Sequence, residues 1–179
     1  MNKYRKPPYP YCPWCAGSLP QGNPFRQECS SCGFVLYHNS SPCVGAVPRD
    51  ASGRVLLGRR GIEPFRGDWN TVGGFLRYGE DPYEGLRREV REELGVPCEV
   101  EEFITMASDT YGKDGPALMN AYFCVRLGSD AIRPQDDVAE LRWFPLESLP
   151  ENIAFQSDRK ALRILTQKAK TSTRRGEEK

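Results

Sequence analysis

One segment constrains the fold of this chain more than any other, because residues 82–94 carry both the start and the stop signals of an amphipathic helix. Asp81 is a good N-cap, Pro82 suits the first helical position, and Glu84 occupies the place of a capping-box partner. Gly95 follows the expected last turn. At about 100° per residue, four apolar side chains share one stripe, namely Tyr83, Leu86, Val90 and Leu94. We therefore predict a helix that packs this stripe on a core.

The sequence around this helix alternates between apolar runs and turn residues, as in an α/β domain. Two strands are predicted at residues 43–47 and 54–59. Because Asp50 and Gly53 supply turn chemistry between them, we expect these strands to form a hairpin. Further strands are predicted at residues 99–106, 118–127 and 140–144, with a turn at residues 112–115.

Composition divides the chain into three regions. Residues 1–39 are rich in Pro, Cys, Gly and aromatic residues, which is typical of a small unit held by something other than a large core. Residues 40–166 carry the predicted strands and helices and end in a helix that Ser157 or Asp158 is expected to cap. Residues 167–179 are predicted to be a basic, disordered tail.

Two CxxC pairs lie in the first region, separated by thirteen residues: Cys12 with Cys15, and Cys29 with Cys32. Two such pairs can close a tetrahedral site of four thiolates, which suits Zn²⁺. The protein would supply all four ligands, so the zinc is expected to be structural. Disulfides and a redox CxxC are the alternatives. His38 is expected to be a surface or linker residue, not a further ligand.

Three carboxylates, those of Glu89, Glu92 and Glu93, occupy an arc of about 100° beside the apolar stripe of the predicted helix. Like charges at these spacings cost about 0.2 to 0.5 kcal/mol per pair. The neighbouring cations are expected to project mostly toward the opposite side, namely Arg87, Arg88 and Arg91. Hard oxygen ligands suit Mg²⁺ or Mn²⁺, so the pattern predicts a divalent-metal site, with a solvated acidic face as the alternative. Gly85 would lie on the same edge and leave room for a metal-bound phosphate.

Residues 74–96 resemble the Nudix box, GX5EX7REUXEEXGU, with every defining position filled. Residues 43–59, the Trp69 loop and residues 140–144 look like the flanking parts of a Nudix domain, which would cover about residues 42–166. The resemblance implies an α/β/α sandwich with a mixed sheet, preceded here by the small zinc ribbon.

The same resemblance implies a metal-dependent hydrolase that cleaves the pyrophosphate bond of a nucleoside diphosphate linked to another moiety and releases a nucleoside monophosphate. Four groups are implied as Mg²⁺ or Mn²⁺ ligands: Glu89, Glu92, Glu93 and the carbonyl of Gly74. Arg88 would orient a carboxylate, with Glu80 as its neighbour or as an outer ligand. Such metals neutralise the diphosphate and activate a water for in-line attack. Glu92, Glu93, Arg88 and Glu80 are thus the expected catalytic residues.

Two features of the site stay open in the sequence. The general base is one of four carboxylates: Glu92, Asp136, Asp137 or Glu140. Arg77 stands where the family often has Glu, and it reverses a charge near the metals. It would either contact a substrate phosphate or weaken one metal position.

The substrate is also open. A zinc ribbon before a Nudix domain resembles the NADH pyrophosphatase group, but the SQPWPFPxS motif of that group is absent from residues 97–119. NADH, FAD, ADP-ribose and similar dinucleotides are therefore all candidates. Tyr111 is placed to stack on a base or simply to flank a hairpin. The rival class is a non-catalytic nucleotide-sensing or nucleic-acid-binding module that uses the fold, the ribbon and the basic ends.

Charge and hydropathy limit the expected cellular location and binding partners of the protein. The 25 Lys plus Arg nearly balance the 24 Asp plus Glu, and the mean hydropathy is -0.60. No apolar run approaches the ~18 residues of a membrane span, and the polar start predicts no secretory signal, so cytoplasmic residence and no membrane partner are expected. Few basic residues lie near the ribbon, so a small-molecule nucleotide is the expected partner and nucleic acid is not. Since Nudix enzymes are often dimers, a homodimer stays open.

Overall fold

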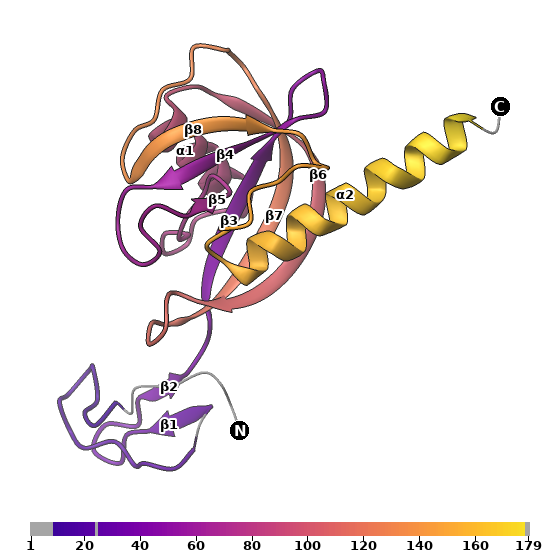
Figure 1. Cartoon of the computed structure of the whole chain (residues 1–179). Coiled ribbons are helices and arrows are strands. Elements are labelled where there is room, and N and C mark those ends of the chain that lie inside the picture. The colour runs from indigo at the N-terminus through magenta and orange to yellow at the C-terminus, as the bar shows by residue number, and fades with distance from the viewer. Residues whose placement is uncertain (1–8, 24, 178–179) are drawn as a thin grey trace.

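The computed structural model describes residues 9–23 and 25–177, with side chains to residue 171. Its elements follow the chain in the order β1 (Arg26–Glu28), β2 (Val35–Tyr37), β3 (Ser41–Pro48), β4 (Val55–Arg60), β5 (Trp69–Asn70), α1 (Pro82–Leu94), β6 (Cys98–Thr110), β7 (Ala117–Leu127), β8 (Val138–Phe144) and α2 (Gln156–Glu177) (Figure 1). The predicted later strands, at residues 99–106, 118–127 and 140–144, are confirmed as parts of β6, β7 and β8.

Two three-stranded sheets form the centre of the larger domain. One has the order β3-β7-β6, with β3 parallel and β6 antiparallel to β7, so it is a mixed sheet. The other has the order β5-β4-β8 and is antiparallel throughout. The strand predictions at residues 43–47 and 54–59 are confirmed by β3 and β4.

The expected hairpin between β3 and β4 is wrong. The turn itself forms, because the Gly53 N–H donates to the Asp50 carbonyl at 3.0 Å. The strands then separate into different sheets, and only Arg49 bridges Val55. Strand β3 pairs with β7 along its whole length and exchanges two backbone hydrogen bonds with Val72, whereas β4 lies between β5 and β8. Both strands thus find better partners than each other.

The strands separate two hydrophobic cores, one beneath each helix. Along β3, Ala46 belongs to the core beneath α1 and Val47 to the core beneath α2. Leu56 and Leu57 divide in the same way along β4. This alternation follows from the two-residue period of a strand. The helices contribute Leu86, Val90 and Leu94 from α1, and Ala161, Leu162 and Leu165 from α2. The predicted α/β/α sandwich with a mixed sheet is confirmed.

Helix α1 begins and ends where local chemistry predicts. The Asp81 side chain accepts hydrogen bonds from the backbone N–H groups of Tyr83 and Glu84, and Gly95 ends the helix in the left-handed conformation at φ 74°. The expected capping-box role of Glu84 is wrong, because its carboxylate instead accepts from Arg87 Nη1 at 2.8 Å. Arg87 lies one turn further along the helix and pairs with this exposed carboxylate, which is then not available to the backbone at the N-cap.

Helix α2 differs from expectation at both ends. It begins at Gln156, so Ser157 and Asp158 lie buried in its first turn instead of capping it. It continues to Glu177, so residues 167–177 are helical where a disordered tail was expected. Ala169 packs on the core and Lys168 pairs with Glu102 of β6, which extends the helix past the expected domain end. Residues 178–179 lie outside the described residues.

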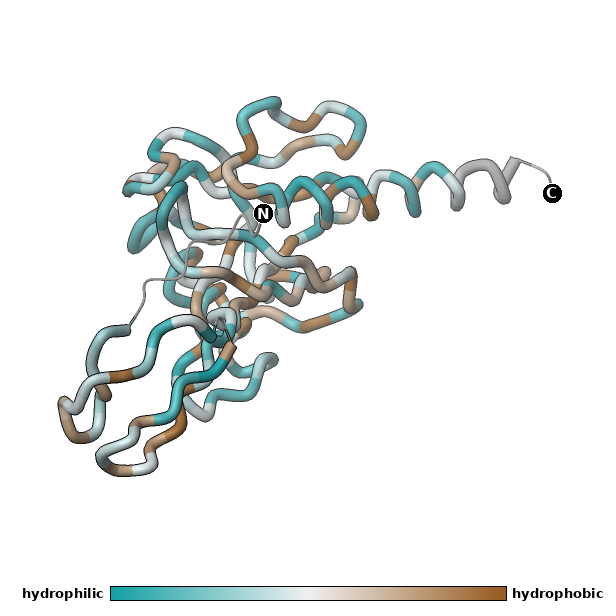
Figure 2. Tube along the Cα trace, turned by 90° about the horizontal axis from the view of Figure 1, so that it is seen from below, coloured by the Kyte–Doolittle hydropathy of each residue, from teal (hydrophilic) through white to brown (hydrophobic). Residues whose placement is uncertain are grey.

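Residues 166–171 of α2 are mostly hydrophilic, and Figure 2 shows hydrophilic colours along much of the projecting helix before its grey end. Within the residues that the structure describes, no helix combines the length and apolarity that crossing a membrane requires.

The four paired cysteines converge in the small N-terminal unit, where β1 pairs with β2. Their sulfur atoms all lie within 4.8 Å of one another, with 3.8 Å between the sulfurs of Cys12 and Cys32 and 3.6 Å between those of Cys15 and Cys29. Tetrahedral Zn–S bonds of about 2.3 Å would place sulfurs about 3.8 Å apart. The arrangement is therefore consistent with a zinc ribbon.

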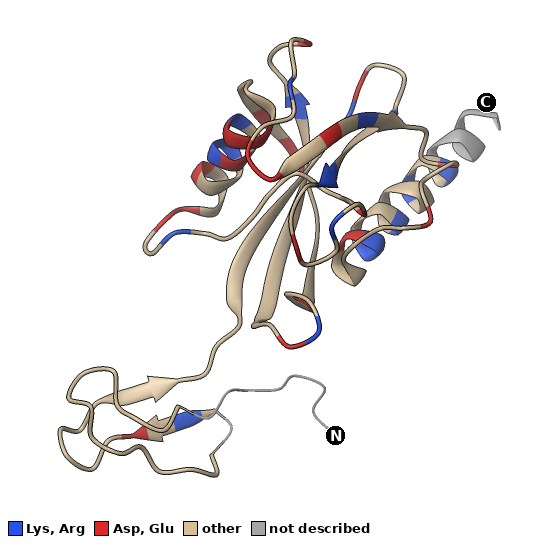
Figure 3. Ribbon diagram, turned by 60° about the vertical axis from the view of Figure 1, so that its left-hand side comes forward, with Lys and Arg blue, Asp and Glu red and all other residues tan. Residues whose placement is uncertain are grey.

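Other predictions for this unit have mixed outcomes. His38 lies outside the sulfur cluster, with Nε2 2.9 Å from Gln27 Oε1 and its ring stacked on Tyr9. Of residues 9–23 and 25–39, only Arg26 and Glu28 carry charged side chains, as Figure 3 shows. The basic residues of the N-terminal end fall outside the described residues, namely Lys3, Arg5 and Lys6.

Candidate active site

A cavity of about 260 Å³ opens among β3, the segment that follows β5, α1 and the loop before β8. Its charged lining groups include Glu89 and Glu93 from α1 and Asp136 and Asp137 from the loop. The Gly73–Gly74 turn forms the adjoining wall. The structure therefore brings two of the three predicted helix carboxylates together with two of the predicted loop carboxylates.

Two glycines allow the helix carboxylates to approach the turn. A Cβ added to Gly74 would lie 2.9 Å from the carboxylate atoms of Glu89. Gly73 has φ 148°, and a Cβ there would meet the Val44 carbonyl oxygen at 2.1 Å. The Gly73 N–H donates to Glu93 Oε2 at 3.2 Å, and the Gly74 carbonyl accepts from the Val44 N–H at 3.0 Å. Bare backbone is thus required on both sides of this contact.

The two buried helix carboxylates are held where negative charge is costly. Burial raises the pKa of Glu93 well above its ordinary value, and Asp137 and Glu89 raise it further. Burial also raises the pKa of Glu89, although Arg88 opposes this effect. Clustered carboxylates with raised pKa values are typical of sites that bind a cation or move a proton.

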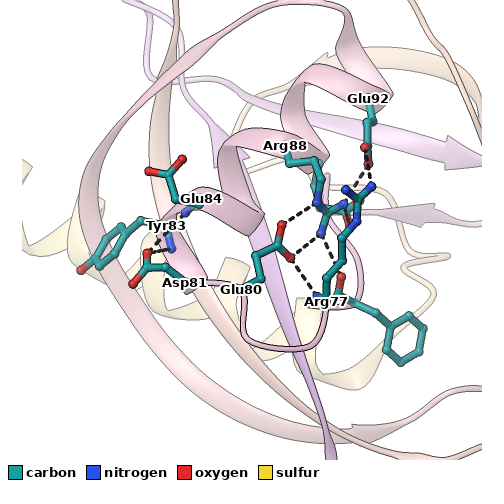
Figure 4. A network of polar contacts seen from close by, with 9 residues as sticks. Arg77, Glu80, Asp81, Tyr83, Glu84, Arg88 and Glu92 are labelled. Atoms are coloured by element: carbon teal, nitrogen blue, oxygen red, sulfur yellow. Dashed lines mark hydrogen bonds and ion pairs between the residues drawn. The ribbon is translucent and has the colours of Figure 1, made fainter.

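Arg88 forms hydrogen bonds with several glutamate side chains (Figure 4). Its Nε and Nη2 donate to the two oxygens of Glu80 at 2.7 and 2.8 Å, and its Nη1 donates to Glu89 at 2.7 Å and Glu92 at 2.8 Å. The bidentate contact lowers the pKa of Glu80 to about 2. Arg88 therefore contacts Glu80, its predicted neighbour, together with two of the predicted ligands. The expectation that it projects away from them is wrong, because its long side chain reaches around the helix edge.

Arg77 contacts two glutamates: its backbone N–H donates to Glu80 Oε2 at 2.8 Å, and its side chain pairs with Glu92. Its Nη2 donates to Glu92 Oε1 at 3.0 Å, and its side chain is 66% exposed. Glu92 is itself 40% exposed in its side chain and is shared between Arg77 and Arg88. The reversed charge at position 77 is thus matched by a surface carboxylate of α1.

The candidates for the general base divide in two. Asp136 and Asp137 line the cavity, whereas Glu92 and Glu140 are not among its lining residues. Glu140 on β8 is bound by Arg142 at 2.5 Å and by Arg59 at 3.2 Å, and these two contacts lower its pKa. A carboxylate stabilised in this way is a weak proton acceptor.

The expected role of Gly85 is wrong. A Cβ at this position would meet Leu76 Cδ2 at 2.3 Å and Glu80 Oε2 at 3.1 Å. The space beside Gly85 is therefore filled by the loop that precedes α1 and is not left for a phosphate. The glycine allows Leu76 and Glu80 to pack closely against the helix.

A buried polar cluster, most of which lines the cavity, was not predicted as part of the site. Asp158 accepts from Thr71 N at 3.2 Å, from Thr71 Oγ1 at 3.0 Å and from the Tyr122 hydroxyl at 2.7 Å, while Ser157 and Asn120 extend the cluster. Burial raises the pKa of Asp158 to about 6. A sequence signal was Asn120, a polar residue in the middle of a mostly apolar strand.

An aromatic wall with one cation completes the cavity. Tyr111 lies 5.5 Å from Phe75 and 6.1 Å from Phe155 between ring centroids, and all three line the cavity. The guanidinium of Arg60 lies 5.3 Å from the Phe155 ring centroid and 5.9 Å from that of Tyr111. Trp69 instead packs in the core against Phe144. Tyr111 is thus at the cavity, and Arg60 was missed by sequence reasoning.

The chain is similar to a known protein family and to solved structures. Residues 40–165 match the family model described as the NUDIX domain. A crystal structure of a NUDIX hydrolase from Nitrosomonas europaea superposes with a TM-score of 0.73 at 27% identity, covering 88% of this chain and 90% of that one.

Two curated relatives share the larger domain. The NAD-capped RNA hydrolase NudC of Chromobacterium violaceum is 31% identical over 142 residues, which are 78% of this chain and 51% of that protein. The ADP-ribose pyrophosphatase of Methanocaldococcus jannaschii is 27% identical over 127 residues, covering 70% of this chain and 73% of that protein. The chain therefore spans about half the length of the first relative.

Proposed function

Because this chain belongs to the NUDIX domain family, we propose that it is a divalent-metal-dependent pyrophosphohydrolase. Its substrate would be a nucleoside diphosphate linked to another moiety, and a nucleoside monophosphate would be released. The observation that carries the proposal is the cavity in which Glu89, Glu93, Asp136 and Asp137 converge beside the Gly73–Gly74 turn.

The donor set fits a hard divalent cation. Two buried carboxylates with raised pKa values face two further carboxylates, and the only cation among the lining residues of the described chain is Arg60. Oxygen ligands of this kind suit Mg²⁺ or Mn²⁺. The proposed ligands are Glu89, Glu92, Glu93 and the Gly74 carbonyl. Such ions would supply charge neutralisation of the diphosphate and Lewis-acid activation of water.

The chain's own residues have distinct parts in this scheme. Arg88 fixes Glu89 and Glu92 by charge-assisted hydrogen bonds, and the Gly73 N–H fixes Glu93. Asp136 and Asp137 lie at the cavity and are the carboxylates available to accept a proton from the attacking water. Glu80 would act through Arg88, as a positioning residue.

The substrate class follows from the relatives and from the aromatic wall. One relative is described as an NAD-capped RNA hydrolase and another as an ADP-ribose pyrophosphatase. We extend the shared element of these names to this chain, namely an ADP-type diphosphate joined to a second group. Tyr111 and Phe75 offer ring faces on which a base could stack.

The four clustered cysteines would bind one structural Zn²⁺. The sulfur separations match a tetrahedral site, and the Trp14 N–H donates to Cys12 Sγ at 3.4 Å. All four positions would be filled by protein, so this ion would take no part in hydrolysis.

The proposal is tested by nucleotide release from a panel of NADH, FAD, ADP-ribose and nucleoside triphosphates with Mg²⁺ or Mn²⁺. We expect monophosphate release from at least one dinucleotide-type substrate. Glu93→Gln should reduce the rate by about 100-fold or more, because a loss of this size is typical when a group that stabilises the transition state is removed.

Glu84→Gln is the matched control, because it removes a carboxylate from the same helix at a site that is 71% exposed. Its rate should equal that of the wild type. Silence of the folded, metal-supplied wild type across the panel would overturn the proposed hydrolysis and favour a nucleotide-sensing module. Equal losses in both variants would overturn the assignment of Glu93.

A further inference from the structure

Arg60 carries a buried positive charge with no protein counter-ion. The residue is only 6% exposed, and no carboxylate of the described chain lies within 4.0 Å of its guanidinium nitrogens. Every other charged residue that lines the cavity is acidic, yet none of these makes an ion pair with it. A buried charge is costly unless it is paired, so this arrangement calls for an anion from outside the chain.

Two hydrogen bonds hold the Arg60 guanidinium in place and leave one edge of it, at Nη1, unused. Its Nε donates to the Pro64 carbonyl at 2.7 Å, and its Nη2 donates to the Tyr111 hydroxyl at 3.4 Å. The rings of Phe155 and Tyr111 flank it. Its Nη1 donates no hydrogen bond to any described residue, and the side chain lines the cavity. The donor is thus fixed before a ligand arrives, which reduces the ordering cost of binding.

We propose that Arg60 is a substrate-specificity residue that binds a phosphate oxygen of the nucleotide through its free guanidinium edge. This inference rests on the proposed function for the identity of the anion as a phosphate. A guanidinium fork matches phosphate geometry, and a charge-assisted hydrogen bond is stronger than a neutral one. Arg60 therefore supplies the positive wall of a cavity whose opposing carboxylates would be occupied by metal.

The consequence is a preference for phosphorylated ligands that does not depend on turnover. A nucleoside monophosphate contains no pyrophosphate bond, so it binds without being cleaved. Comparing a monophosphate with its nucleoside isolates the contribution of the phosphate. Arg60→Gln should remove most of that contribution and leave the aromatic contacts with the base.

The test is calorimetric titration of the full chain in Mg²⁺ with the four ribonucleoside 5′-monophosphates and their nucleosides. We expect the wild type to bind at least one monophosphate about tenfold or more tightly than its nucleoside. In Arg60→Gln this preference should fall to near unity, with the nucleoside affinity unchanged.

Arg59→Gln is the matched control, since Arg59 is the adjacent residue, its side chain is 49% exposed, and it pairs with Glu140 outside the cavity. It removes the same charge and should keep the wild-type preference. Arg60→Lys keeps the charge without the fork and should give an intermediate preference, which preserves the test if the glutamine variant fails to fold.

Three results would overturn the inference: no phosphate preference in the wild type, an unchanged preference in Arg60→Gln, or equal loss of monophosphate and nucleoside in both Arg60 variants. The last result would reduce Arg60 to a support for the loop at Pro64. A wild type that prefers monophosphates through Arg60 but hydrolyses no diphosphate would uphold this inference and contradict the proposed function.

Discussion

At the scale of single residues, Arg88 shows what a sequence can and cannot predict. Its place in the pattern correctly identified it as the partner of Glu80. Helical periodicity alone placed it on the opposite side from the carboxylates, because periodicity fixes the Cβ direction and not the reach of a flexible side chain. Arg60 and Asp158 went unrecognised as site residues for a related reason. Their burial depends on segments distant in sequence, and no local pattern reports it.

Replacing Glu80 tests the Arg88 contact through pH. The pKa of Glu80 is lowered from 4.5 to about 2, first by the Arg88 hydrogen bonds and then by the Arg77 N–H. A carboxyl group whose pKa is lowered by folding stabilises the fold at pH values above its pKa in the unfolded chain. This stabilisation is lost as the pH falls through its pKa in the folded state. The free energy of unfolding of the wild type should therefore exceed that of Glu80→Gln at neutral pH, and the difference should shrink between pH 4.5 and 2.

Urea denaturation across this pH range measures the difference directly. Glu84→Gln, which removes an exposed carboxylate, should show little change over the same window. A wild-type advantage over Glu80→Gln that stays constant down to pH 2 would show that the Arg88 contact does not depend on the ionised carboxylate.

Replacing Glu93 tests whether its buried negative charge destabilises the fold when no metal is bound. Burial, Asp137 and Glu89 raise the pKa of Glu93, so the folded state retains a proton above pH 4.5 that the unfolded chain has released. The stability of the metal-free wild type therefore falls as the pH rises above 4.5. In EDTA at neutral pH, Glu93→Gln should therefore be more stable than the wild type, because the variant carries no charge that burial opposes.

Chemical denaturation with and without Mg²⁺ provides the check. Adding Mg²⁺ should stabilise the wild type and leave Glu93→Gln nearly unchanged. A variant that is less stable than the wild type in EDTA would show that the buried Glu93 carboxylate does not destabilise the metal-free fold.

At the scale of elements, the predictions succeeded where local chemistry decides the outcome. Helix α1 has its predicted bounds because Asp81 and Gly95 act on neighbouring backbone groups. The hairpin of β3 and β4 failed because strand partners are set by tertiary pairing, in which a strand buried on both faces favours a parallel neighbour. The extension of α2 was missed because its contacts with β6 come from a distant segment.

The cap of α1 can be tested on stability. Asp81→Ala removes the acceptor for two backbone N–H groups at the start of the helix that carries the carboxylates. The free energy of unfolding should fall by about 1 kcal/mol, the usual contribution of an N-cap. Asp81→Ser keeps an acceptor and should recover most of the loss in urea denaturation. Equal stability of the alanine variant and the wild type would mean that tertiary packing alone fixes the start of α1.

At the scale of the whole molecule, the chain holds separate cores with different sources of order. The larger domain is built on the two cores that flank its strands, whereas the described residues of the N-terminal unit form a small core of Cys12, Leu19 and Cys29 with two partly buried neighbours. A core of that size requires a further constraint. The cysteine spacing predicted this constraint, since four thiols in two pairs encode the cluster locally.

Removal of zinc should therefore affect the two parts differently. A strong zinc chelator should release about one metal ion per chain and expose the thiols of the cluster, while the buried Cys43, Cys98 and Cys124 stay protected in the folded larger domain. Thiol titration with a colorimetric disulfide reagent, with and without chelator, measures this. Exposure of all seven thiols at once, or of none, would contradict two separately stabilised parts.

We propose that the carboxylate-lined cavity hydrolyses a diphosphate by attack of water on phosphorus. The most direct test is turnover of the active panel substrate in ¹⁸O-labelled water with Mg²⁺, followed by mass spectrometry of both products. We expect one solvent oxygen to be incorporated into a phosphate group of one product, with no turnover in EDTA. Products without solvent oxygen on phosphorus, or equal turnover without metal, would contradict it.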